Sequence, residues 1–88
     1  MDLVAEARAE LLSKTREQIE RETAFKWAAR AVAAYELWVR GDREMYHDAV
    51  CYIGEALEHA VFADETGQTV QDVRDWVHRY VPRGALGG

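Results

Sequence analysis

The sequence predicts an all-α fold, a long antiparallel helical hairpin followed by a short C-terminal helix. The window from 25 to 39 is apolar, rich in alanine and free of Gly and Pro, as expected for a central helix. Apolar residues recur at three- and four-residue spacing on both sides of it. The chain has one Pro, and three of its six Gly lie in the last five positions. We therefore expect one helical domain over residues 1–81, with 82–88 as a flexible tail.

The first predicted helix runs from about residue 2 to residue 40, or roughly 58 Å at 1.5 Å per residue. Asp2 is placed to cap its start, and no residue between Ile19 and Phe25 stops a helix. The apolar stripe of its first half points away from the apolar arc of its second half. One partner helix from the same chain does not cover both faces, so a homodimeric bundle is expected. The alternative is a kink near residues 20–23 that folds the first half back into a monomeric bundle.

Two further helices follow from the turn signals. Gly41 fits the left-handed position after a helix, and an apolar strip at helical spacing predicts a second helix over about 43–64. Thr69 followed by Asp72 resembles a capping box and opens a third helix over about 69–81, before Pro82. The second helix is expected to pack antiparallel on the 25–39 window.

The net charge, the cysteine count and the motifs of the sequence disfavour several classes of function. Lys and Arg number 11 against 16 Asp and Glu, a formal net charge of −5 that disfavours nucleic acid and anionic membranes as partners. The apolar window is shorter than the ~20 residues of a membrane span. A single cysteine and an acidic start without a signal-peptide pattern indicate a cytoplasmic protein. Nucleophile-elbow, phosphate-loop and dinucleotide glycine patterns are absent from the sequence, so an enzyme is not the favoured interpretation.

The favoured hypothesis is a small acidic interaction module, an adaptor or inhibitor, that acts as a homodimer on an unidentified and possibly basic protein partner. Its predicted contact residues belong to the first helix and to the acidic outer face of the second. They are Leu11, Leu12, Ile19, Phe25, Trp27, Cys51, Glu55, Glu58 and Phe62. Cys51 is expected to be unreactive, because neighbouring carboxylates raise the pKa of a thiol. No cofactor is expected under this hypothesis.

Two alternatives stay open. The first is a carboxylate and histidine bundle that binds iron or zinc across a dimer, as an oxidase or a metal store. Its candidate ligands are Glu22, Glu36, His47, Glu55, Glu58 and His59. The second is a helix-turn-helix nucleic-acid binder in which Arg74, Arg79 and Arg83 contact phosphate, an interpretation that the net charge opposes.

Overall fold

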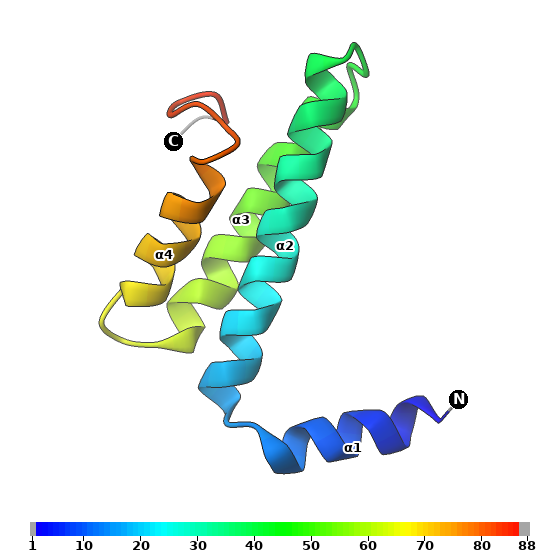
Figure 1. Cartoon of the computed structure of the whole chain (residues 1–88), viewed down its shortest axis with the longest axis vertical. Helices are drawn as coiled ribbons and strands as arrows, with labels where there is room; N and C mark the ends of the chain where they lie inside the picture. The colour runs from blue at the N-terminus through cyan, green and yellow to red at the C-terminus, as the bar shows by residue number, and fades with distance from the viewer. Residues whose placement is uncertain (1, 87–88) are drawn as a thin grey trace.

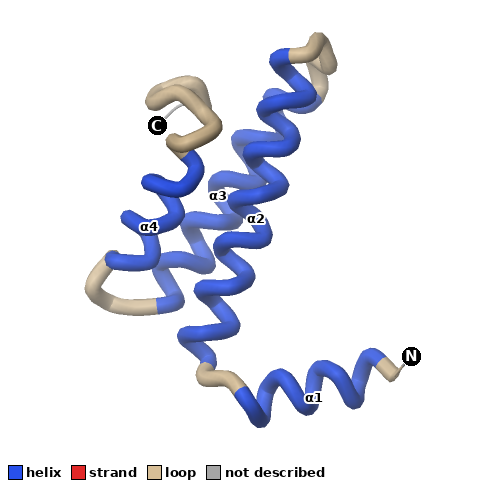
Figure 2. The backbone as a smooth tube through the Cα atoms, in the orientation of Figure 1, coloured by secondary structure: helices blue, strands red, loops and turns tan. Residues whose placement is uncertain are grey.

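The fold consists of four helices, and residues 2–86 contain no strand (Figures 1 and 2). The computed structural model describes these residues. The helices are α1 (Leu3–Ser13), α2 (Arg16–Val39), α3 (Met45–Ala63) and α4 (Gln68–Val77). The predicted all-helical class is confirmed. Helices α2 and α3 lie side by side, α4 packs against both, and α1 projects away from the other three (Figure 1).

The expected single helix from 2 to 40 is wrong, because the chain breaks between α1 and α2. Lys14 and Thr15 both have extended backbones, with φ/ψ of −126°/148° and −72°/161°. The Thr15 hydroxyl accepts from the Gln18 N–H at 3.2 Å, and the Gln18 side chain accepts from the Thr15 N–H at 2.8 Å. This reciprocal capping box starts a new helix at Arg16. The alternative kink at residues 20–23 is also not observed, since α2 is continuous there.

Two predicted helix ends are confirmed. The Asp2 carboxylate accepts from the N–H groups of Val4 and Ala5 at 3.0 and 3.1 Å and caps α1. At the end of α2, Gly41 has φ +116°, and its N–H donates to the Trp38 carbonyl at 2.9 Å. The Asp42 N–H donates to the Leu37 carbonyl at 3.1 Å, which completes a Schellman motif.

The last helix is shorter than expected. It ends at Val77 rather than near residue 81, and tight turns follow to Val81. Residues 82–86, which belong to the segment expected to be a flexible tail, form a turn in which the Ala85 N–H donates to the Pro82 carbonyl at 3.1 Å. Leu86 packs against the core. The remainder of the predicted tail, 87–88, lies outside the described residues.

The core is built from small side chains. Within residues 2–86, every hydrophobic residue classed as buried is Ala or Val, and the fully buried side chains of largest volume are Val73 and Val81. Alanines from both helices line the contact between α2 and α3: Ala24, Ala28, Ala31 and Ala34 from α2, and Ala49, Ala56, Ala60 and Ala63 from α3. Side chains without a γ carbon allow the two backbones to approach closely, so added volume is poorly accommodated there.

We expect Ala28→Leu to destabilise the protein by about 1–3 kcal/mol, because Ala28 is 0% exposed and three extra heavy atoms overpack the contact between α2 and α3. For a chain of this size each kcal/mol lowers Tm by roughly 4–8 °C. Thermal unfolding followed by circular dichroism measures the change. Ala33→Leu, an exposed position on the same helix, is the matched control and leaves Tm nearly unchanged. Equal Tm for the two variants would contradict close packing at Ala28.

Candidate interaction surfaces

Helix α1 is the most exposed apolar element of the described chain. It has no buried residue, and the exposed fractions of Leu3, Leu11 and Leu12 are 69%, 69% and 81%. Leu3, Ala7 and Leu11 are four residues apart and therefore lie in one row along the helix. Glu6 and Arg8 flank Ala7, at the centre of that row. The N-terminal helix thus presents an apolar row with one acid and one base beside its midpoint.

An ion pair spans the break between α1 and α2. Lys14 Nζ lies 2.8 Å from Oε2 of Glu22, the seventh residue of α2. The hydrogen bond to Glu22 raises the pKa of Lys14 above its ordinary value of 10.5. A raised lysine pKa means that the contribution of this pair is complete below about pH 10 and is lost as the pH rises further. At neutral pH the pair therefore helps to set the direction in which α1 leaves the bundle.

The outer face of α3 carries four of the predicted contact residues. Cys51, Glu55, Glu58 and Phe62 are all exposed, and their spacing of three and four residues places them in one stripe along α3. Phe62 is 62% exposed and its neighbour Val61 is 60% exposed, so the stripe ends in an apolar patch. Next to Cys51, the His47 Nε2 atom lies 3.5 Å from the thiol sulfur.

Three other predicted contact residues are half-buried within their own chain. Phe25 packs edge-on against Trp76 of α4, with ring centroids 6.1 Å apart. Trp27 contacts Tyr52 of α3 at 5.6 Å between ring centroids. Ile19 is also only partly accessible. Much of the surface of these three side chains is therefore used by the monomer, which sequence periodicity alone did not reveal.

The six candidate metal ligands are not brought together. Within residues 2–86, no group of three or more His, Cys, Asp or Glu side chains is placed to hold an ion. Glu22 is engaged by Lys14, and the His59 Nδ1 atom lies 2.6 Å from Glu20 Oε2, which ties α3 to α2. His47, Glu55 and Glu58 lie on the outside of α3, and Glu36 is exposed on α2.

A second apolar surface, which the sequence reasoning missed, lies where α2 turns into α3. Leu37, Trp38 and Val39 are 44%, 38% and 61% exposed, and Tyr46 covers part of the Trp38 ring at a centroid distance of 5.0 Å. The signal in the sequence was the run of three large apolar residues directly before Arg40 and Gly41. We name Leu37, Trp38, Val39 and Tyr46 the turn patch.

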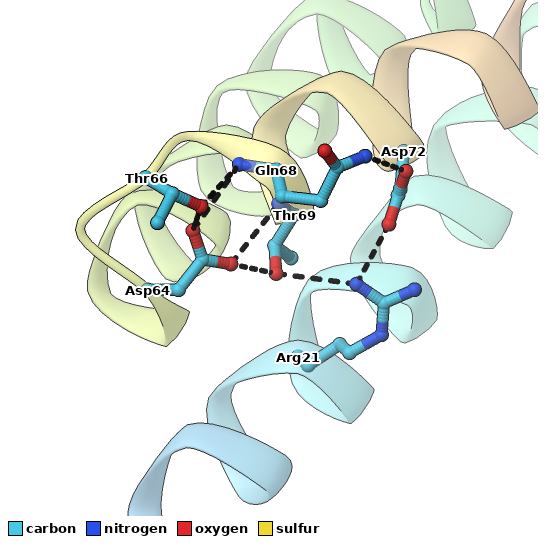
Figure 3. A network of polar contacts seen from close by, with 6 residues as sticks. All are labelled: Arg21, Asp64, Thr66, Gln68, Thr69 and Asp72. Carbon is cyan, nitrogen blue, oxygen red and sulfur yellow. Dashed lines mark hydrogen bonds and ion pairs between the residues drawn. The ribbon is translucent and has the colours of Figure 1, made fainter.

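A polar network fixes the start of α4 and with it the lower end of the bundle (Figure 3). Asp64, just after α3, accepts from the hydroxyls of Thr66 and Thr69 and from the N–H groups of Gln68 and Thr69. This replaces the predicted capping box, because Asp64 rather than Asp72 satisfies the first turn of α4. The chain enters α4 through Gly67, whose φ is +80°.

Arg21 connects this network to α2. Its guanidinium donates to the Thr69 hydroxyl at 3.2 Å and to Asp72 at 3.0 Å, and the Gln68 amide donates to the other oxygen of Asp72 at 2.7 Å (Figure 3). The hydrogen bonds from Gln68 and Arg21 hold the pKa of Asp72 below its ordinary value of 3.8. The chain segments of three helices therefore meet in one set of hydrogen bonds around Thr69, whose side chain is buried.

Comparison with family models, with curated protein sequences and with solved structures finds no match for this chain. Among the described helices, none combines the length and the apolar character that crossing a bilayer requires.

The acid dependence of stability tests the Asp64 network. Hydrogen bonds from the side chains of Thr69 and Thr66, joined by backbone N–H groups, hold the pKa of Asp64 well below its ordinary value of 3.8. A depressed carboxyl pKa contributes stability that is present above about pH 4 and is lost as the pH falls further. We expect Asp64→Asn to lower Tm at pH 7 and to flatten the fall in Tm between about pH 4 and pH 2.

Glu65→Gln is the matched control, because it removes one negative charge at the next residue, which is exposed. Melting curves of both variants and of the parent across this pH range provide the comparison. A loss of Tm in acid that is equally steep in Asp64→Asn and in the parent would contradict the role of this carboxylate.

Proposed function

We propose that this chain is a small acidic interaction module of the cytoplasm, without enzymatic activity, that pairs with a second copy of itself and docks on a protein partner. The observation that carries the proposal is the position of the large apolar side chains. The buried core contains Ala and Val, whereas Leu3, Leu11, Leu12 and Phe62 are each more than three-fifths exposed.

This distribution is the reverse of the usual one, in which Leu and Phe are among the residues most often fully buried. A short chain buries a smaller share of its surface than a long one, so a core of Ala and Val leaves it with little apolar stabilisation. Association adds the missing burial. Helix α1 is the natural place for it, because α1 contributes no buried residue to its own chain.

The sequence of α1 suits antiparallel pairing with a second copy. With a two-fold axis at Ala7, Leu3 of one copy faces Leu11 of the other. Ala7 at the centre permits close approach of the two helices. The apolar row is thus self-complementary in this arrangement, which a two-fold symmetric contact demands.

Two helices of 11 residues, each roughly 16 Å long, do not reach the ~1,200 Å² of a stable interface by themselves. The rest of the dimer contact is assigned to the start of α2. There a shallow groove beside the break is lined by Phe25 and Ala29, among others. In the antiparallel arrangement the N-terminal turn of each α1 reaches toward this groove on the other copy.

The stripe of α3 that contains Glu55, Glu58 and Phe62 is assigned to the protein partner. It combines two carboxylates with an exposed aromatic ring in a chain of net charge −5. Such a surface fits a partner that presents Lys or Arg around an apolar hollow, because charge steers the encounter and the ring supplies buried area.

Mass measurement under native conditions tests the dimer. We expect a dimer for the parent chain and a dissociation constant at least about tenfold higher for Leu11→Glu, since burying a Leu side chain contributes about 1.5–3 kcal/mol. Val39→Glu is the control, because Val39 is 61% exposed at the opposite end of α2. A monomer at all concentrations, or equal effects of the two variants, would contradict pairing through α1.

The partner surface is tested by reversing its charge. Glu55→Lys combined with Glu58→Lys is expected to weaken binding of a purified partner and to flatten the dependence of its affinity on salt concentration. Glu36→Lys with Glu65→Lys makes the same change in net charge at exposed positions outside the stripe and is the control. Unchanged affinity of the α3 variant would remove the stripe from the proposal.

A further inference from the structure

A pocket of about 190 Å³ lies between α3, α4 and the C-terminal turn. Its wall is mainly apolar, with Val50, Ile53 and Leu57 from α3, Val77 from α4, and Val81 and Leu86 from the segment after α4. An apolar cavity of ~150 Å³ is sufficient to bind benzene in another protein. The pocket is therefore large enough for a small apolar ligand.

Gly54 lines the same pocket from the interior of α3. Glycine is the least favourable helix residue after proline, so its presence in the middle of a 19-residue helix requires a reason. Close packing is not the reason, because a Cβ atom built at Gly54 meets no atom within 4 Å. What glycine provides at this position is open volume at the pocket wall.

The polar part of the pocket is basic. Arg74 and His78, four residues apart, are the lining residues with ionisable side chains, and no acid lines the pocket although acids outnumber bases in the chain. Arg74 is exposed on α4. The His78 Nδ1 atom lies 3.1 Å from the Val81 carbonyl, which fixes the imidazole ring against the C-terminal turn.

We propose that this pocket binds a small monocarboxylate with an apolar tail. The pocket is somewhat larger than the ~150 Å³ cavity that binds the six carbons of benzene, so a tail of about six heavy atoms is of suitable size. The tail occupies the space beside Gly54, and the carboxylate pairs with Arg74, whose planar guanidinium matches two carboxylate oxygens. This site is independent of the proposed dimer and of the α3 stripe.

Hexanoate and 1-hexanol are the probes, because they share the tail length and differ in charge. Titration of the ¹⁵N-labelled full chain is expected to shift the amide signals of Gly54 and His78 with saturation at a hexanoate Kd on the order of 1 mM. Hexanol is expected to bind at the same place about tenfold more weakly, since it lacks the charge-assisted bond to Arg74.

Three variants separate the tail from the head group. Arg74→Gln is expected to bring hexanoate down to the affinity of hexanol, whereas Arg79→Gln, which removes an equal charge outside the pocket, leaves the difference intact. Gly54→Leu fills the space and is expected to abolish binding of both probes. Gly54→Ala, which favours the helix, is expected to weaken both severalfold and serves if Gly54→Leu does not fold.

Several results would overturn the proposal. These are failure of hexanoate to saturate, equal affinity of acid and alcohol for the parent, and shifts centred on the turn patch or on α1 instead of on Gly54. Unaltered binding by a folded Gly54→Leu or Gly54→Ala variant would overturn it as well. Native mass measurements in the presence of hexanoate keep the result separate from the dimer, whose subunit count is expected to stay the same.

Discussion

The close approach of α2 and α3 along facing alanines is the constraint on which the rest of the structure depends. Small side chains bring two long helices together, but they remove little apolar surface from water per residue. The aromatic residues are consequently displaced to the margins of this contact. There Trp27 contacts Tyr52, Phe25 contacts Trp76, and the turn patch stays partly exposed. The same constraint thus leaves large apolar side chains such as Leu11, Leu12 and Phe62 exposed on the surface.

Hydrogen bonds and an ion pair stabilise the junction of α4 with the bundle, where the core of small side chains buries little apolar surface. Arg21, Asp64, Thr69 and Asp72 connect the start of α2, the end of α3 and the start of α4, and each carboxylate has at least two donors (Figure 3). A satisfied network of this kind fixes orientation, because its donors and acceptors fit one arrangement of the three helices. The position of α4 in turn determines the pocket, since Arg74 and Val77 of α4 line it together with Val50 and Gly54 of α3.

The helical class, the cap at Asp2 and the stop at Gly41 were predictable, because each depends on residues close together in sequence. The break at Lys14 and Thr15 was also encoded locally by Thr15 and Gln18, but the apolar period and the helix-forming residues on both sides concealed it. The choice of Asp64 over Asp72 as the partner of Thr69 depends on where the chain enters α4, which a single spacing does not determine.

For the candidate surfaces, helical period alone predicted the shared stripe of Cys51, Glu55, Glu58 and Phe62. The half-burial of Phe25 and Trp27 was not predictable, because it depends on contacts with α4 and α3. The pocket at Gly54 was not predictable, because its other lining residues come from segments distant in the sequence.

The length and isolation of α1 have a thermodynamic consequence. A helix of 11 residues without tertiary support is near the limit at which helices persist in water, where the cost of nucleation is barely recovered. Ordering α1 is therefore part of any association that uses it, and the free energy of ordering is subtracted from the free energy of contact. Ala5 and Ala9, which lie off the row of Leu3, Ala7 and Leu11, already favour the helical state before contact is made. Evolution or design can then adjust the strength of association through the helical population of the free chain, at positions that never touch the partner.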